Sequence, residues 1–344
     1  MTLRLGLVGC GRLAEHGYVP AIAATPGVAL AALVDPDPRR RALVASLAGG
    51  RAGTGIATHD DVASLLAGGA VDAVVLASPA EAHLDDATRV AAAGLPALVE
   101  KPPAPDAVGA AALAALDPAP HVAFNRRFAR GLAAVRRALP VRGAVELRLA
   151  LHYRRQSWGA VQVRADALAD LGPHLVDWAR WLLGAEVDAV EAVALAPDDA
   201  RLTLHLGAHR AHLHAAADRL HQELVEARGP SGAVVARQRV GGPVAAVTGR
   251  LRPGPHPLVT SLRDQLVAFA GAARGRPAPD LGTAADGAAC MAVLDAARTA
   301  DGRRSPTPVA PQETPCSPSA SSTPPAPRSS VASSTTDASP PSRA

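Results

Sequence analysis

The sequence predicts an α/β protein in which a doubly wound parallel sheet is followed by an α+β domain built on a mostly antiparallel sheet. Three observations support this prediction. Up to residue 125 of 344, short apolar runs alternate with helix-like segments, as in parallel sheets with crossover helices. A glycine-rich turn follows the first apolar run. Beyond residue 125, apolar and polar residues alternate strictly in several runs, which is typical of strands with one exposed face.

The composition indicates a globular protein with two sizeable cores. Hydrophobic residues make up 48% of the chain, charged residues 19%, and the net charge is +4. The arginines form scattered pairs without interleaved aromatic residues, so we expect solvated faces and no nucleic-acid partner. No apolar run approaches about 18 residues, so we expect no membrane span. With three widely separated cysteines and no signal peptide, the sequence suggests a cytoplasmic location.

The first apolar run, Leu3 to Val8, ends in the turn Gly9-Cys10-Gly11-Arg12-Leu13-Ala14. A strand, a glycine turn and the start of a helix form the fingerprint of a dinucleotide site. The glycines let the backbone approach a pyrophosphate, and the helix N-terminus stabilises its charge. We expect four residues of this turn to bind the cofactor: Gly9, Gly11, Arg12 and Leu13.

The second apolar run, Val28 to Val34, ends in Asp35. An acidic residue about 20 positions beyond the glycine turn is placed to bind the ribose hydroxyls. Its charge repels a 2′-phosphate, so Asp35 favours NAD over NADP. Arginines 39 to 41 follow closely and are able to bind that phosphate, so NADP stays an alternative.

Two further strands end in polar residues. The run 71–76 leads into Ser78-Pro79, and His83 falls in the first turn of the next helix, where it either faces the cofactor or caps and packs. The strand 97–99 leads into Glu100-Lys101-Pro102. Ligands of open parallel sheets bind outside the carboxyl ends of the strands. We therefore expect these residues to line the cofactor site: Ser78, Pro79, His83, Glu100 and Lys101.

Lys101 is the only lysine in a chain that is rich in arginine. Arginine stays protonated, whereas lysine is a compact charge whose pKa falls readily when it is desolvated. A lysine at the end of a strand is therefore suited to stabilise an alkoxide or to share a proton with it. The alternative is an accidental surface lysine.

The strand 121–124 delivers Asn125, the only asparagine in the chain, flanked by two of the three phenylalanines. Asn125 either lines the site or is a turn residue beside core aromatics. We place the first domain at residues 1–125 and the second at 126–303. Residues 304–344 are rich in Ser and Pro and too poor in large apolar residues to fold, so we predict a disordered tail.

In the second domain, the runs 145–151, 201–206 and 210–216 alternate, and the last two predict a hairpin. Between the first two lies a segment that predicts a helix with Pro173 in its first turn. Asp170 is expected just before this helix and His174 in the first turn. A carboxylate near an imidazole orients it and raises its basicity. The alternative is a capped amphipathic helix with a surface histidine.

Four histidines of the second domain raise the question of a metal site: His205, His209, His212 and His214. Their spacing matches no compact ligand set. We therefore predict no metal and interpret these residues as part of an exposed or interfacial sheet face.

Taken together, these motifs resemble the Gfo/Idh/MocA oxidoreductases, which include glucose–fructose oxidoreductase and inositol dehydrogenases. The matching pieces follow the family's order over residues 1 to about 300: the glycine turn 9–14, Asp35, Ser78-Pro79 with His83, Glu100-Lys101-Pro102, Asn125 to Phe128, and Asp170 to Asp177. The resemblance implies an N-terminal Rossmann domain and a C-terminal domain with a large open sheet that often mediates oligomerisation.

The resemblance also implies an NAD(P)-dependent dehydrogenase or reductase acting on a sugar, cyclitol or keto-sugar derivative. Lys101, Asp170 and His174 would then meet beside the nicotinamide. His174 would exchange the hydroxyl proton, Asp170 would orient His174, and Lys101 would stabilise charge on the oxygen. The alternatives are an NAD-dependent glycosidase of the same family and a dinucleotide-sensing regulator without catalysis. An unpaired sheet face needs covering, so a homodimer or homotetramer is expected.

Overall fold

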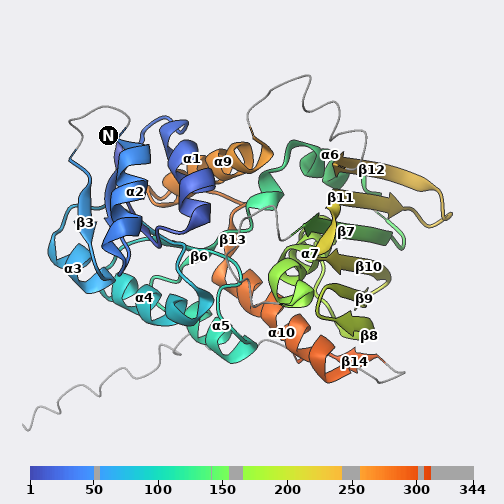
Figure 1. Cartoon of the computed structure of the whole chain (residues 1–344). Coiled ribbons are helices and arrows are strands. Elements are labelled where there is room, and N and C mark those ends of the chain that lie inside the picture. Colours follow the sequence, from blue (N-terminus) through green and yellow to red (C-terminus); the bar gives the residue numbers. More distant parts are fainter. Residues whose placement is uncertain (50–54, 141, 155–165, 242–255, 301–305, 311–344) are drawn as a thin grey trace, which may run out of the picture. The chain divides into compact units, whose positions relative to one another are not determined.

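The computed structural model describes residues 1–49, 55–140, 142–154, 166–241, 256–300 and 306–310 (Figure 1). Within these ranges the strands form two seven-stranded sheets. The strands of the first sheet are β1 (Leu3–Val8), β2 (Val28–Val34), β3 (Ala57–His59), β4 (Ala73–Leu76), β5 (Ala97–Val99), β6 (His121–Val122) and β13 (Gly282–Thr283). Their order is β13-β6-β5-β4-β1-β2-β3, with β1 to β6 parallel and only β13 antiparallel. The predicted parallel sheet is thus confirmed.

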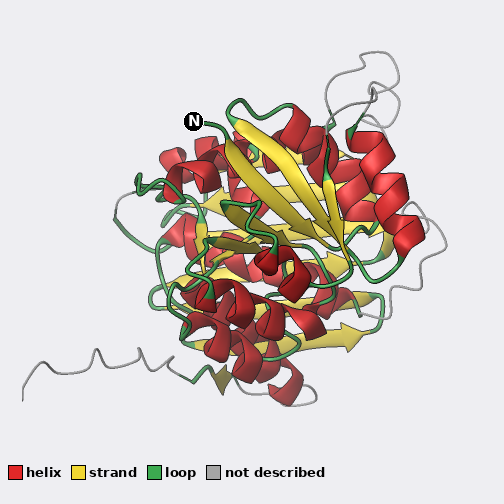
Figure 2. Ribbon diagram, turned by 90° about the vertical axis from the view of Figure 1, so that its left-hand side faces the viewer, coloured by secondary structure: helices red, strands yellow, loops and turns green. Residues whose placement is uncertain are grey.

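Helices cover both faces of this sheet (Figure 2). They are a π-helix η1 (Ala14–Tyr18), α1 (Val19–Ala23), α2 (Pro38–Ala48), α3 (Val62–Ala67), α4 (Ala80–Ala92), α5 (Ala107–Ala114) and α9 (Pro257–Ala272). Alternate side chains of β1 join different cores: Leu5 and Leu7 pack with α1 and α9, whereas Val8 packs with α3 and α4. Burial on both faces is why these strands appear in the sequence as continuous apolar runs.

Aspartates begin three of these helices. The side chains of Asp37, Asp61 and Asp106 accept hydrogen bonds from main-chain N–H groups at the starts of α2, α3 and α5, over 2.7–2.8 Å. Each such cap stabilises its helix by about 1 kcal/mol, since it satisfies an N–H that has no partner within the helix. This local chemistry accounts for where α2, α3 and α5 begin.

The second sheet is mostly antiparallel, as predicted. Its strands are β7 (Glu146–Arg154), β8 (Ala189–Ala196), β9 (Asp199–Leu206), β10 (His209–Ala216), β11 (Asp218–Arg228), β12 (Val234–Gly241) and β14 (Thr307–Pro308). Their order is β12-β11-β7-β10-β9-β8-β14, and only β7 and β10 are parallel. The predicted hairpin is β9–β10, which turns at Gly207 with φ of 57°.

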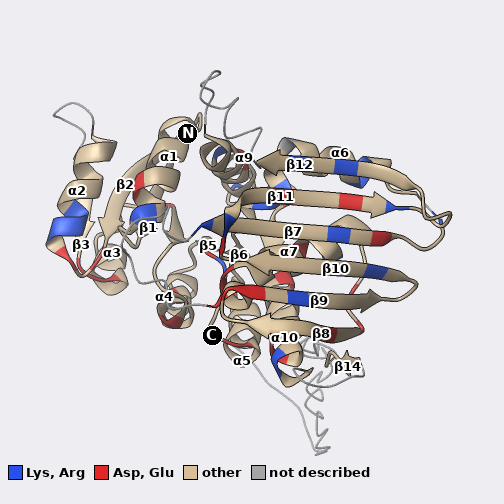
Figure 3. Ribbon diagram, turned by 45° about the vertical axis from the view of Figure 1, so that its right-hand side comes forward, with Lys and Arg blue, Asp and Glu red and all other residues tan. Residues whose placement is uncertain are grey.

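One face of the second sheet is covered and the other carries polar residues. The remaining helices of the described residues are η2 (Asn125–Phe128), α6 (Arg130–Ala138), α7 (Ala167–Leu183) and α10 (Ala284–Ala300). Leucines 147, 149 and 151 of β7 point into the core with α7. The alternate positions include the polar side chains Glu146, Arg148 and His152, and Lys/Arg and Asp/Glu bands cross the strands in Figure 3. This face is the exposed side of the sheet.

The structure corrects the predicted start of the helix that carries His174. α7 begins at Ala167 rather than at Pro173, and Pro173 lies inside it. The reason is a cap further upstream: the Asp166 side chain accepts a hydrogen bond of 2.6 Å from the Ala169 N–H. Asp170 therefore lies in the first turn, and His174 follows one turn later on the same face.

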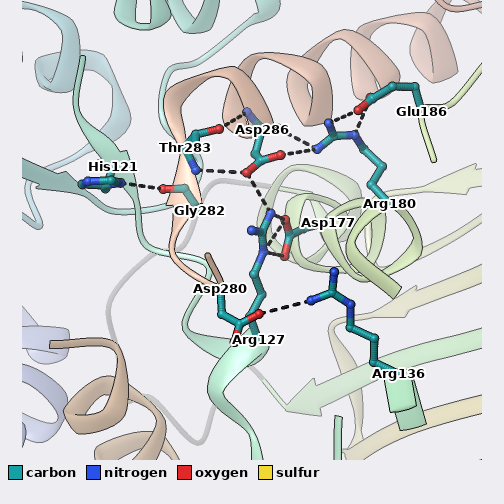
Figure 4. Close-up of polar contacts among 10 residues, drawn as sticks. All are labelled: His121, Arg127, Arg136, Asp177, Arg180, Glu186, Asp280, Gly282, Thr283 and Asp286. Atoms are coloured by element: carbon teal, nitrogen blue, oxygen red, sulfur yellow. Dashed lines mark hydrogen bonds and ion pairs between the residues drawn. The ribbon is translucent and has the colours of Figure 1, made fainter. Parts of the chain in front are cut away.

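A network of ion pairs around the buried Arg127, Asp177 and Arg180 joins η2, α7 and α10 (Figure 4). Arg127 contacts Asp177 through two nitrogens, at 2.5 and 3.0 Å, and Asp286 at 3.1 Å. Asp286 also binds Arg180 at 3.1 Å, and Arg180 in turn binds Glu186 at 2.6 Å. The side chains of Arg127 and Asp177 are only 4% and 1% exposed. The network ties the segment after β6 to the helix that carries Asp170 and His174.

The predicted boundaries 1–125, 126–303 and 304–344 stay predictions. Thr307 and Pro308, inside the predicted tail, form β14 against β8. The remainder of the tail prediction, residues 311–344, lies outside the described residues.

None of the helices in the described ranges combines the length and apolarity that a membrane span needs.

Candidate active site

Four strands of the first sheet end at the same edge. Val8 of β1 pairs with Val34 of β2 and with Leu76 of β4, and Leu76 pairs with Val99 of β5. The residues that follow these strands therefore lie along one edge: Gly9, Asp35, Ser78 and Glu100 with Lys101. Most of the predicted site residues are brought to this edge by the strand register alone.

The glycine turn has the geometry that a dinucleotide requires. Gly9 has φ of 92°, and a Cβ there would lie 2.5 Å from the main-chain oxygen of Ala77. Only glycine fits, because the turn crosses the end of β4 so closely. A Cβ at Gly11, in contrast, would meet no atom within 4 Å. This open space beside the turn is where a pyrophosphate would approach. Leu13 instead packs against the core of the first sheet.

Asp35 accepts hydrogen bonds from main-chain N–H groups of the glycine turn and of the residues that follow it. Its Oδ2 accepts a 2.8 Å hydrogen bond from the N–H of Cys10, and Oδ1 accepts one of 2.9 Å from the N–H of Asp37. A carboxylate oxygen has more than one lone pair, so these bonds leave capacity for ribose hydroxyls. Asp35 thus stands beside the glycine turn, as the sequence predicts.

Two of the arginines after Asp35 are bound to the protein itself. Arg40 donates to the main-chain oxygen of Cys10, at 2.8 and 2.5 Å, and pairs with Glu15 at 2.5 Å. Arg41 donates to the main-chain oxygen of Asp35. Both guanidinium groups would have to give up contacts to bind a 2′-phosphate.

Lys101 and Asp170 meet across a sequence separation of 69 residues. The Nζ of Lys101 donates to the main-chain oxygen of Asp170 at 2.9 Å and to its Oδ1 at 3.0 Å. The two side chains are 18% and 19% exposed, so their charges are partly desolvated. The other carboxylate oxygen of Asp170, Oδ2, accepts a hydrogen bond from the hydroxyl of Tyr153 on β7.

His174 is buried one turn beyond Asp170, at 6% exposure. Its Nδ1 is enclosed without a hydrogen-bond partner. Burial, followed by the charges of Lys101 and Arg126, lowers the pKa of His174 well below its ordinary value. No hydrogen bond joins the described side chains of Asp170 and His174, so the predicted orientation of the imidazole by Asp170 is not a direct contact here.

Residues 3–123 match a family profile described as "Oxidoreductase family, NAD-binding Rossmann fold", that of Gfo/Idh/MocA. Inositol 2-dehydrogenase 2 of Saccharopolyspora erythraea is 33% identical over 204 residues, which are 57% of this chain and 58% of that protein. By the profile match, residues 3–123 are similar to the NAD-binding domain of the Gfo/Idh/MocA oxidoreductases. A second relative, the rhizopine catabolism protein MocA of Rhizobium meliloti, is 34% identical over 191 residues, 53% of this chain and 58% of that protein.

This chain thus matches 58% of the length of either relative. A solved structure, the myo-inositol dehydrogenase of Lactobacillus casei in complex with NAD(H) and myo-inositol, has a TM-score of 0.73. It is 18% identical, and the match covers 92% of this chain and 99% of that chain. At such identity the likeness concerns the fold alone. The predicted resemblance to this family is confirmed over residues 3–123, and the predicted α/β fold with an NAD-binding Rossmann domain is confirmed.

His83 lies beneath the site. It is 1% exposed, and its Nε2 lies 2.8 Å from the main-chain oxygen of Ser78. Its Nδ1 lies 3.2 Å from the main-chain oxygens of Pro102 and Pro103. Burial lowers the pKa of His83. Of the two alternatives considered for His83, these contacts favour packing, which joins the start of α4 to the segment that carries Lys101.

Glu100 is likewise directed inward. Its Oε1 accepts a 2.6 Å hydrogen bond from the hydroxyl of Tyr18, and its Oε2 accepts one of 3.1 Å from the N–H of Lys101. Burial raises the pKa of Glu100. Tyr18 ends η1, the helix after the glycine turn, so this pair connects the cofactor-binding turn to the main chain of the lysine.

Asn125 and its neighbour Arg126 follow β6. The amide of Asn125 is buried and donates to the hydroxyl of Ser261 on α9 at 3.2 Å. Arg126 forms an ion pair with Glu223 of β11. Burial lowers the pKa of Arg126 to about 10, so it stays charged at neutral pH near His174. Site lining by Asn125 stays a prediction.

Sequence reasoning missed Tyr153, Arg126 and Glu223. Tyr153 is one of only two tyrosines in the chain, a rarity comparable to that of the single lysine. A rare residue type near the end of an alternating strand was the feature from which the sequence could have indicated Tyr153. Glu223 gave no such signal, because glutamates are common on exposed strands.

The four histidines considered as metal ligands have separate partners. The pairs are His205 with Glu191 at 2.7 Å, His209 with the main-chain nitrogen of Val145 at 3.0 Å, His212 with Thr203 at 3.2 Å, and His214 with His152 at 3.1 Å and Asp199 at 2.9 Å. Within the described ranges no three His, Cys, Asp or Glu side chains are arranged to hold a metal ion. The prediction that the protein uses no metal stays a prediction.

The position of Asp35 leads to a prediction about cofactor choice. We expect Asp35→Ala to weaken NAD binding about 10-fold, because charged hydrogen bonds to the ribose are lost, and to change NADP binding little. Isothermal titration calorimetry with both cofactors measures this, with Asp37→Ala as the control that removes a nearby helix cap. An equal loss for both cofactors would mean that Asp35 only holds the turn through the Cys10 N–H.

Proposed function

We propose that this protein is an NAD-dependent dehydrogenase that acts on a CH–OH group of a polyhydroxylated substrate: a sugar, a cyclitol or a keto-sugar derivative. The observation that carries the proposal is the contact between Lys101 and Asp170, one helical turn from the buried His174, at the edge where the glycine turn lies. The relatives named as inositol 2-dehydrogenases support the substrate class.

The residues have distinct roles in this proposal. NAD, when bound, accepts the hydride of the carbinol carbon or returns it. His174 takes the hydroxyl proton at Nε2, the ring nitrogen that is not enclosed, and its lowered pKa keeps it free to do so. Lys101 places its ammonium near the oxygen and stabilises the negative charge that develops there. Asp170 holds the ammonium in place.

We infer that NAD rather than NADP is the working cofactor. The carboxylate of Asp35 stands beside the glycine turn, where it would accept hydrogen bonds from the ribose hydroxyls and repel a 2′-phosphate. Two of the three arginines that follow Asp35, Arg40 and Arg41, already donate to main-chain oxygens. To bind a 2′-phosphate, either of these two guanidinium groups would have to give up its contact.

Self-association and a cytoplasmic location belong to the same proposal. The exposed face of the second sheet carries charged side chains such as Arg148 and Arg201, which are 55% and 51% exposed. A homodimer or homotetramer would cover such a face. We also expect a small-molecule substrate, with neither nucleic acid nor membrane as a partner.

A spectrophotometric screen tests the function. The protein is mixed with NAD or NADP and a panel of inositols, sugars and sugar acids, and with NADH or NADPH and keto-sugars, while absorbance at 340 nm is followed. Turnover with one substrate, stronger for NAD, supports the proposal. Tight NAD binding by calorimetry without turnover favours instead the NAD-dependent glycosidase or the dinucleotide-sensing regulator. Release of the aglycone from a chromogenic glycoside separates these two.

The pH dependence of turnover follows from His174. Because burial and neighbouring positive charges lower its pKa, we expect kcat/KM for alcohol oxidation to stay constant as the pH falls through 6.5. The rate should decline only well below that value, where the imidazole becomes protonated. pH–rate profiles of the parent and of His174→Gln measure this, and the variant should lose the acidic limb. An acidic limb centred at 6.5 or above would contradict this assignment.

A further inference from the structure

Tyr153 lies near the end of β7 with its side chain on the covered face of the second sheet. It follows Leu149 and Leu151 at alternate positions and packs against the same core. Its hydroxyl donates a hydrogen bond to Oδ2 of Asp170 on α7. The next residue toward the N-terminus, His152, points to the opposite face and contacts His214 at 3.1 Å.

Asp170 is therefore held from two directions. Lys101 binds Oδ1 and the main-chain oxygen from the end of β5, and Tyr153 binds Oδ2 from β7. A carboxylate with both oxygens engaged is confined to one orientation. The ammonium of Lys101 ends a flexible four-carbon stem, so the orientation of its acceptor decides where the charge is placed.

We propose that Tyr153 is a positioning residue of this site, which fixes Asp170 and through it the ammonium of Lys101. This inference rests on the proposed dehydrogenase function. Tyr153 lies outside the motifs by which the sequence resembles the family. Tyr153 acts through Asp170 and need not touch the substrate. Pre-organisation of this kind matters because a small misplacement of a catalytic group costs a large part of the rate.

The competing explanation is that the hydroxyl only helps to pack β7 against α7. The two explanations differ in what Tyr153→Phe changes. If the hydroxyl only packs, Tyr153→Phe lowers the melting temperature and leaves the position and reactivity of Lys101 unchanged. Loss of positioning leaves the fold intact, because the ring stays in place, and releases Asp170 and with it Lys101.

The single lysine permits a test that needs no substrate. Acetic anhydride at neutral pH acylates Lys101 and the N-terminal amine, and peptide mass spectrometry gives the ratio of the two rates. We expect Lys101 to react about threefold faster in Tyr153→Phe than in the parent, and faster still in Asp170→Asn. Tyr153→Phe added to Asp170→Asn should change nothing more, because Tyr153 acts through Asp170. Tyr153→His, which keeps a donor, should restore much of the protection.

Kinetics supply the second readout. With a substrate from the 340 nm screen, we expect Tyr153→Phe to lower kcat about 10-fold with KM and the NAD affinity nearly unchanged. Thr203→Val is the matched control, since it removes a strand hydroxyl whose hydrogen-bond partner among the described residues is His212, away from the candidate site. We expect this control to turn over like the parent.

The outcomes separate this inference from the proposed function. Unchanged acylation of Lys101 in Tyr153→Phe overturns the positioning role, whether or not turnover is found. Faster acylation without turnover of any substrate supports the positioning of Lys101 and counts against the dehydrogenase. Faster acylation with an unchanged kcat overturns the positioning role in catalysis.

Discussion

Replacing Lys101 with methionine is expected to lower kcat by about 10³-fold and to leave the affinity for NAD nearly unchanged. Methionine has a similar length but no charge, so the oxygen of the substrate loses the ammonium that would stabilise it. Asp170 simultaneously loses its two contacts with Nζ, at 2.9 and 3.0 Å. Initial rates at 340 nm and calorimetric titration with NAD measure the two effects separately.

Lys101→Arg is the control for charge alone. Arginine keeps the positive charge, but its planar fork does not reproduce the compact contact with Asp170 and does not give up a proton. We therefore expect this variant to lose most of the activity as well. Partial recovery of the activity of a third variant, Lys101→Ala, by added ethylamine would support the role of the amine. A turnover close to that of the parent in Lys101→Met would remove Lys101 from the mechanism.

Much of the first sheet was predictable, because its strands are set by local sequence. The ranges 3–8, 28–34 and 97–99 match β1, β2 and β5 residue for residue. Each is a short apolar run closed by a glycine or a polar residue, so the information lies within the run. The edge to which these strands deliver their polar residues then follows from the topology.

The second sheet was less predictable. β11 has mixed polar and apolar residues along its length, and only Val225, Glu226 and Ala227 in it are fully buried. β12 lies at the edge and is largely exposed. Neither strand has the alternation that reveals a half-buried strand, since their burial is decided by neighbours far away in the chain.

The candidate site, too, could be predicted from the sequence only in part. The sequence indicated Lys101 and Asp170 as site residues, yet only the fold reveals that Tyr153 completes their contact. Conversely, His83 and Glu100 carry chemistry-bearing side chains at the right edge and are turned inward to bind main-chain groups and Tyr18. Position at a strand end is readable from sequence, whereas the direction of a side chain depends on tertiary packing.

The second large effect is expected at the buried ion pair of Arg127 and Asp177. Asp177→Ala leaves a guanidinium of 4% exposure with Asp286 as its remaining carboxylate, 3.1 Å away. We expect the free energy of unfolding to fall by about 3 kcal/mol, because an uncompensated buried charge is costly. Urea unfolding followed by circular dichroism measures the change. Replacing both partners, as in Arg127→Met with Asp177→Leu, should recover most of the loss.

An exposed pair in the same region provides the matched control. Arg136 and Asp280 are 3.1 Å apart with side chains 43% and 51% exposed (Figure 4). Because solvent screens their attraction, Asp280→Ala is expected to cost at most about 1 kcal/mol. Asp280 is the better residue to replace, since Arg136 also stacks on Trp181. Equal losses for the two aspartates would show that burial does not set the cost. A larger loss at Asp177 would show that burial sets the cost of removing a carboxylate from an ion pair, and that the contact between η2 and α7 contributes substantially to stability.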